Sequence, residues 1–141
     1  MNTNFIAGVP DVVGARSDRV RRRTPSQVNQ AIDARTHARM DDALSRGRDA
    51  IINRIHRLDR ELDIDRMLMA HFALMGSTAV GLGRRNGYAR FLAFAQTGFL
   101  LMQALAGWCP PVVVFRRLGF RTAREIASER AALVEKLAGW N

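Results

Sequence analysis

The pattern of apolar and polar positions changes several times along the chain and divides it into four stretches. Residues 1–25 combine glycine and proline with a basic cluster, which predicts a flexible arm without fixed structure. Residues 26–66 repeat apolar positions at helical spacing and predict a helical region. Residues 67–108 hold two uncharged runs, and residues 109–141 open on a proline pair and continue in an amphipathic pattern. The sequence therefore predicts an all-α protein.

Two helices are expected between residues 26 and 66. At Thr24-Pro25-Ser26 a hydroxyl can cap free backbone N–H groups and proline suits the first turn, so the first helix begins here and runs to about Ser45. Gly47 then interrupts the pattern. In the second helix, which we expect to continue into the first apolar run, four apolar residues share one face: Ile51, Ile55, Leu58 and Leu62. The opposite face is charged and predicts a solvated surface with ion pairs three or four residues apart, such as Arg57 with Glu61.

The two apolar runs, residues 67–83 and 91–108, contain no formal charge and are separated by a tight polar turn. Both are apolar around the whole helical circumference, whereas a surface helix of a small soluble protein shows a polar stripe. Tyr88 and Trp108 lie at segment ends, where interfacial aromatic residues are enriched. Each run is at the short end of what crosses a hydrocarbon core of roughly 30 Å. The pattern predicts a membrane hairpin of two short transmembrane helices over residues 67–108.

A few polar and small side chains within the runs indicate how the helices pack. Gln96 and Gln103 are seven residues apart and share a face, which predicts interhelical hydrogen bonds. His71 lies about one turn inside the first run; we expect it to bond a backbone carbonyl or Gln103, with proton or ligand handling as the alternative. Small residues at intervals of four allow close approach of two helices within or between chains: Ala73, Ser77 and Gly81.

The chain is expected to leave the membrane at Cys109-Pro110-Pro111, because two prolines remove donors and end a helix. Residues 112–115 are apolar but too short to span, so we place them along the interface. Thr122 and Glu125 have the spacing of a capping box, which opens a last amphipathic helix expected to pack on the helix before the hairpin.

Charge sets the expected orientation. The chain has a formal net charge of +9, and Lys136 is the one lysine among its 22 basic residues. Arginines are fewer at the hairpin turn than at the opposite ends of the two runs, which predicts that both termini lie in the cytoplasm. Anionic lipid is the expected partner. Nucleic acid is disfavoured because the basic arm lacks interleaved aromatics. Contacts with lipid headgroups are expected for Arg84, Arg85, Arg116 and Arg117.

Candidate chemistry is sparse. Three histidines and one cysteine share no metal-ligand spacing, and no catalytic constellation appears, so we expect no metal, no cofactor and no enzymatic activity. Cys109 has two interpretations: a reactive thiol at the cytoplasmic interface, or a small apolar residue that fills the turn.

The stretch from residues 61–66 through both runs to Gly107-Trp108-Cys109-Pro110-Pro111 resembles the two-helix transmembrane domain of the inner-membrane rhodanese family. Residues 116–119, Arg-Arg-Leu-Gly, resemble a stand-alone bacterial subgroup without the rhodanese domain. The resemblance implies an integral inner-membrane hairpin that associates as a dimer. It does not imply sulfurtransferase chemistry, because Cys109 matches the cysteine of the transmembrane domain and the catalytic domain is a separate α/β unit.

Three functional hypotheses follow. The first is a non-enzymatic membrane protein that acts as a scaffold, anchor or accessory subunit of a membrane complex. The second makes Cys109 a sulfur or redox relay for a cytoplasmic partner. The third is a soluble basic helical protein that binds nucleic acid or an acidic partner.

Overall fold

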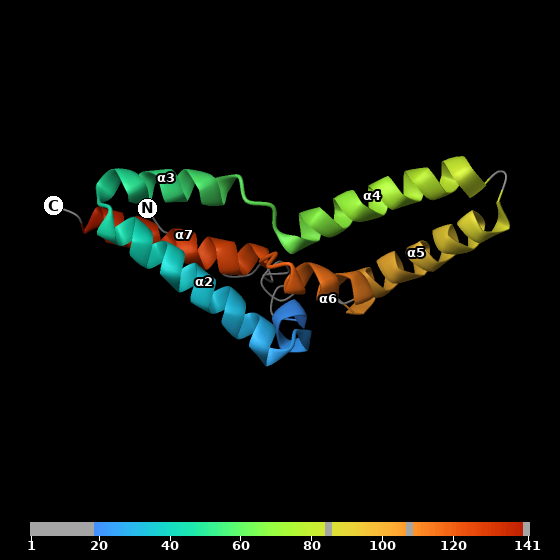
Figure 1. Cartoon of the computed structure of the whole chain (residues 1–141), viewed down its shortest axis with the longest axis horizontal. Helices are drawn as coiled ribbons and strands as arrows, with labels where there is room; N and C mark the ends of the chain where they lie inside the picture. Colours follow the sequence, from blue (N-terminus) through green and yellow to red (C-terminus); the bar gives the residue numbers. More distant parts are fainter. Residues whose placement is uncertain (1–18, 84–85, 107–108, 140–141) are drawn as a thin grey trace, which may run out of the picture.

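The computed structural model describes residues 19–83, 86–106 and 109–139, and within these ranges all regular structure is helical. The described part begins with helical residues 19–23. Six further helices follow in chain order: α2 (Ser26–Ser45), α3 (Arg48–Asp59), α4 (Ile64–Gly83), α5 (Gly87–Ala106), α6 (Pro110–Arg117) and α7 (Ala123–Ala138). The molecule is elongated, with a helical lobe at one end and a two-helix hairpin protruding from it (Figure 1). The prediction of an all-α fold is confirmed for the described residues.

Helices α2, α3 and α7 form the lobe (Figure 1). The turn between α2 and α3 is made at Gly47, whose φ of 92° lies in the left-handed region that glycine adopts without strain. The apolar face of α3 packs against α7 as predicted, and Leu62 stays 48% exposed. The buried cluster between them consists of Ile51, Ile55, Leu58, Ile126 and Leu133.

The beginning of the described chain differs from the expected flexible arm. Residues 19–23 are helical, and Val20 is fully buried. Helix α2 begins at Ser26 as predicted, but Thr24 does not cap it, because its hydroxyl donates to the Val20 carbonyl at 2.8 Å. The arm prediction is therefore wrong for residues 19–25, and its remaining part lies outside the described residues.

The expected continuous helix from the lobe into the hairpin is wrong. Helix α3 ends at Asp59 and α4 begins at Ile64. Asp63 accepts a hydrogen bond from the Arg66 backbone N–H at 2.9 Å and so supports the first turn of α4. The Ile64 N–H donates to the Arg121 carbonyl at 2.9 Å, which ties the break to the segment before α7.

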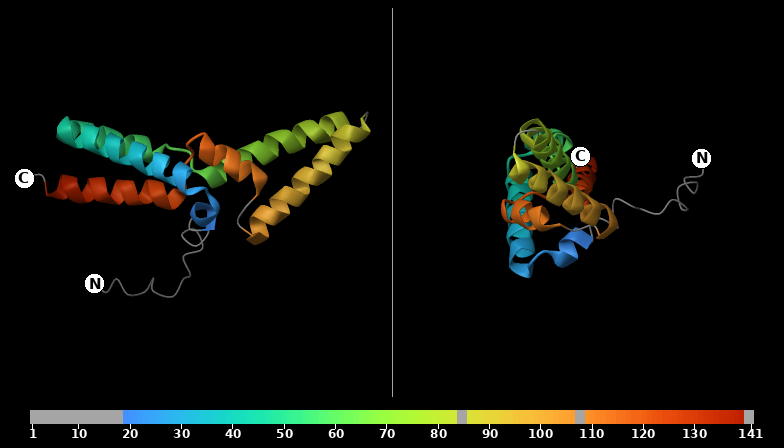
Figure 2. Two further views of the ribbon diagram at one scale, coloured as in Figure 1. Left: turned by 60° about the horizontal axis from the view of Figure 1, so that its bottom comes forward. Right: turned by 90° about the vertical axis from the view of Figure 1, so that its right-hand side faces the viewer.

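Helices α4 and α5 pack side by side as an antiparallel hairpin that points away from the lobe (Figures 1 and 2). Among the described helices, only α5 is long and apolar enough to cross a membrane by length and composition. Helix α4 has the same length but includes Asp65, Arg66 and His71. Composition therefore supports one of the two expected spans.

The segment after the hairpin forms a short helix, α6, for which no secondary structure was predicted. Helix α5 ends at Ala106, and Pro110 occupies the first turn of α6, where its missing N–H is no loss. The expected helix break at the prolines is thus confirmed, but residues 112–115 continue as helix. The predicted capping box of α7 is also confirmed, with both reciprocal hydrogen bonds between Thr122 and Glu125.

Candidate functional site

The candidate site is the protruding hairpin together with its base, where α6 and residues 19–23 meet the start of α4. One polar contact links the two hairpin helices: the Gln96 side-chain amide donates to the Phe72 carbonyl at 2.6 Å. A Cβ built on Gly76 would lie 3.6 Å from Gln96 Nε2, so the missing side chain leaves room for this amide. Gln96 therefore makes an interhelical hydrogen bond, as predicted.

Gln103 and His71 do not pair as expected. Gln103 is 7% exposed, and neither polar atom of its side chain has a hydrogen-bond partner among the described residues. His71 instead makes edge-to-face contacts with Phe72 and Phe115, with ring centroids 5.7 and 5.6 Å apart. The spacing in the sequence correctly predicted that Gln103 lies on the inner face of the hairpin, where it is buried. The spacing could not predict a hydrogen-bond partner for Gln103.

The ladder of small residues faces outward. Ala73 and Ser77 are exposed, and the Ser77 hydroxyl donates to the Ala73 carbonyl of its own helix at 2.8 Å. A Cβ built on Gly81 would meet nothing within 4 Å. Within one chain the ladder does not bring α4 and α5 together, which leaves it free for a contact between chains.

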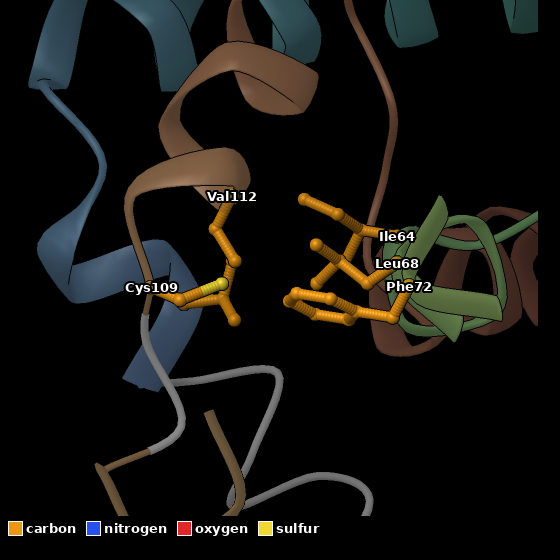
Figure 3. Packing of buried hydrophobic residues seen from close by; sticks show 6 residues of the cluster. Ile64, Leu68, Phe72, Cys109 and Val112 are labelled. Carbon is orange, nitrogen blue, oxygen red and sulfur yellow. The ribbon is translucent and has the colours of Figure 1, made fainter. Parts of the chain in front are cut away.

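Cys109 is packed inside the base of the hairpin. It is fully buried in a cluster with Val20, Ile64, Leu68, Phe72 and Val112. Figure 3 shows the Cys109 and Val112 side chains pointing toward the apolar side chains of α4. Burial raises the pKa of the thiol, although the Val112 backbone N–H acts in the opposite direction. A protonated, enclosed thiol is a poor nucleophile, so the geometry favours the packing interpretation over the reactive thiol.

Arg116 is not available to lipid headgroups. It is 1% exposed, because it lies one helical turn after buried Val112 and faces inward with it. Its guanidinium donates to Glu125 at 2.7 and 2.9 Å and to the Asn29 side chain at 2.7 Å. The expected headgroup contact is therefore wrong for Arg116. Arg117 is exposed, and Arg84 and Arg85 lie outside the described residues.

The Glu125 carboxylate joins three segments at this point. Besides Arg116, it accepts a hydrogen bond from Arg21 at 2.7 Å, and Arg21 also binds Asp33 of α2. Burial acts to raise the pKa of Glu125, but the hydrogen bonds from Arg116, the Thr122 backbone and Arg21 outweigh it and lower the pKa. The same ion pairs raise the pKa of Arg21, where the bond to Asp33 contributes most. Glu125 thus links residues 19–23, α6 and α7.

A second carboxylate, Glu129, lies deeper in the lobe. Its side chain is fully buried and accepts bonds from Arg54 Nε at 2.8 Å and Nη2 at 3.1 Å, and a short one from Arg121. Arg121 in turn donates to Glu61 at 2.7 and 2.8 Å. Burial tends to raise the pKa of Glu129, but the two guanidinium groups lower it.

This ion network was not predicted, because Glu61 was expected to pair along its own helix. One signal was present in the sequence: Arg54 falls on the apolar face of α3, between Ile51 and Leu58. A cation there needs a buried counter-ion, since an unpaired buried charge is strongly unfavourable.

These features define an all-α protein with an ion-paired lobe and a protruding apolar hairpin. In the described part of the chain, no group of three His, Cys, Asp or Glu residues gathers to hold a metal ion. Comparison with known proteins gave no significant match to any family model, curated protein or solved structure.

Proposed function

We propose that the chain is an integral membrane protein whose α4–α5 hairpin inserts into a lipid bilayer. The observation that carries this proposal is the placement of exposed apolar side chains. Of 17 large apolar residues that are exposed in the described part, 5 lie on α4 and 8 on α5. Phe94 is 78% exposed, Leu105 77% and Leu74 70%. An apolar surface this concentrated is typical of a membrane or protein interface.

A lipid bilayer covers this apolar surface better than a protein partner would, for two physical reasons. The exposed side chains surround both helices, so a partner with a single contact face would leave much of the apolar area in water. Helix α5 has 20 residues, which corresponds to about 30 Å of rise and matches the thickness of a hydrocarbon core.

The lobe supports an orientation with both termini in the cytoplasm of a bacterial cell. Its surface is rich in arginine, and Arg117 at the end of α6 is exposed beside the base of the hairpin. Cations on this side are favoured by the anionic inner leaflet. The proposed role is a scaffold, anchor or accessory subunit of a membrane complex. The outward-facing ladder on α4 supports a second copy of the chain as a partner.

Membrane insertion is tested by washing membranes at alkaline pH and comparing matched variants. We expect the wild-type chain to stay in the pellet. Phe94→Arg places a charge on the hairpin and costs about 2.5–3.5 kcal/mol of insertion free energy near the bilayer centre, so it should shift the chain to the supernatant. Val134→Arg, on the exposed face of α7, is the control and should not. A wild-type chain found in the supernatant would exclude membrane insertion.

Orientation is tested separately by labelling single cysteines in a Cys109→Ala background with a membrane-impermeant maleimide. Asn86→Cys at the hairpin turn should react in intact cells, whereas Ser128→Cys on the exposed face of α7 should react only after lysis. The reverse pattern would refute the orientation while leaving membrane insertion standing.

A further inference from the structure

Helices α2 and α3 run antiparallel from the turn at Gly47, and a groove between them is lined largely by arginine. One hollow of about 450 Å³ is bordered by residues of both helices, among them Arg39, Arg46, Asn53, Arg54 and Arg57. An adjoining hollow of about 620 Å³ shares Asn53 and Arg57 and adds His56 and Arg60. Volumes of roughly 300–1,000 Å³ are typical of small-molecule sites.

The groove has more positive charge than its own residues neutralise. Arg46 pairs with Asp42 at 2.8 Å. Arg39, Arg57 and Arg60 are exposed, and none makes an ion pair with another described residue. Each of these three guanidinium groups is therefore able to bind an external anion. The excess charge therefore indicates an anionic ligand.

Arg54 adds a fixed donor to the wall of the groove. Its side chain is 9% exposed, and its orientation is set by the two bonds from Nε and Nη2 to Glu129. Its remaining terminal nitrogen, Nη1, has no hydrogen-bond partner in the described part of the chain. A donor held in place before binding loses little entropy when the ligand arrives. This guanidinium distinguishes the groove from an ordinary basic surface.

We propose that the α2–α3 groove binds a small, multiply phosphorylated anion. Guanidinium groups bind phosphate through paired N–H donors, and several of them along one groove match a ligand with more than one phosphate. The turn between α2 and α3 lies at the end of the lobe opposite the hairpin (Figure 1). The hollow bordered by Arg39 and Arg46 lies toward this turn and away from the bilayer that would hold the hairpin (Figure 1), which favours a soluble phosphorylated ligand over a lipid headgroup. The inference does not depend on membrane insertion.

The test measures tripolyphosphate binding by isothermal titration calorimetry to the full-length chain, held in phosphatidylcholine nanodiscs or, if it does not insert into them, free in buffer. Arg39→Gln/Arg57→Gln removes two unpaired groove cations and should weaken binding by at least about tenfold. The control, Arg22→Gln/Arg23→Gln, removes the same charge from exposed sites outside the groove and should change affinity by less than about twofold. Melting temperatures of both variants near wild type establish that the fold is intact, and Arg60→Gln replaces Arg39→Gln if the latter lowers it.

Three outcomes would overturn the proposal. The first is no binding of tripolyphosphate by the wild-type chain. The second is equal weakening in both double variants, which would assign the effect to net charge alone. The third comes from a parallel experiment with phosphatidylglycerol vesicles. If the loss of Arg39 and Arg57 abolishes vesicle capture but leaves the tripolyphosphate affinity unchanged, the ligand is a lipid headgroup and not a soluble anion.

Discussion

The Glu129 carboxylate provides the sharpest test of what holds the lobe together. Its side chain has no exposure, and it accepts bonds from both Arg54 and Arg121, which are nearly as buried. Glu129→Gln keeps the shape of the side chain but removes the negative charge. Arg121 then keeps Glu61, whose side chain is 27% exposed, and Arg54 is left without an ion-pair partner among the described residues.

The magnitude follows from the contacts that are lost. A hydrogen bond to a charged group contributes about 1.5–3 kcal/mol, and breaking a buried ion pair by removing one partner costs about 3–5 kcal/mol. Since the amide oxygen of glutamine still accepts one bond, we expect a loss of about 3–4 kcal/mol in the free energy of unfolding of the lobe. This is a large fraction of the roughly 5–15 kcal/mol that stabilises a typical domain.

The assay is a urea titration of the full-length chain in nanodiscs, followed by far-ultraviolet circular dichroism. The matched control is Asp59→Asn, which removes a carboxylate from the Asp59–Arg130 pair, where the side chains are 44% and 48% exposed. Exposed pairs contribute about 0–1 kcal/mol, so this variant should unfold near the wild-type midpoint. Equal, small effects of Glu129→Gln and Asp59→Asn would refute the argument that the buried network stabilises the lobe.

Three further predictions concern acid, the thiol and a turn. The native pKa values of Glu125 and Glu129 lie below their ordinary value of 4.5, so the unfolded chain binds more protons in acid than the native chain does. The free energy of unfolding should therefore be constant above about pH 5 and fall as the pH drops through the native pKa values. Urea midpoints measured at several pH values test this dependence. Cys109, fully buried, should react with a maleimide only after unfolding, and Cys109→Ser should lower the free energy of unfolding by about 1–3 kcal/mol; rapid labelling of the native chain would restore the reactive-thiol interpretation. Gly119 has a φ of 96°, so Gly119→Ala should lower the free energy of unfolding by about 1–2 kcal/mol in the same titration, because alanine is strained at this backbone angle. The contact with Arg35 adds little to this cost: its Nη1 lies 3.1 Å from the position of the new Cβ, but the flexible side chain can move aside.

Local signals in the sequence predicted most helix boundaries correctly. Gly47 marks the turn between α2 and α3, the proline pair marks the break after α5, and the capping box starts α7. In each case the residues that set the boundary lie within a few positions of it. The apolar face of α3 was also readable, since helical spacing alone predicts which of its residues are buried.

Long-range contacts explain the parts that the sequence did not predict. Arg121 binds Glu61 across 60 positions, and Arg21 binds Glu125 across 104. Neither pairing leaves a periodic signal in the sequence. The sequence pattern therefore does not distinguish an arginine that binds a buried carboxylate from one that binds a lipid headgroup. The same contacts explain the break between α3 and α4 and the ordered residues 19–23, because both segments are held by partners near the start of α7.

The base of the hairpin sets how deeply the proposed membrane segment can lie. Ile64, Leu68 and Phe72 are buried against α6, so α4 leaves the lobe only after Phe72 and extends about 16 Å beyond it at 1.5 Å per residue. That length is about half of a hydrocarbon core of roughly 30 Å. A hairpin that crosses the bilayer must therefore bring the cluster around Cys109 and Val112 into the hydrocarbon edge, or the bilayer must thin around it. The cluster is apolar and tolerates this depth, whereas the ion pairs of Arg116 directly behind it do not. Headgroup level then falls within α6, between Val112 in its first turn and the exposed Arg117 at its end.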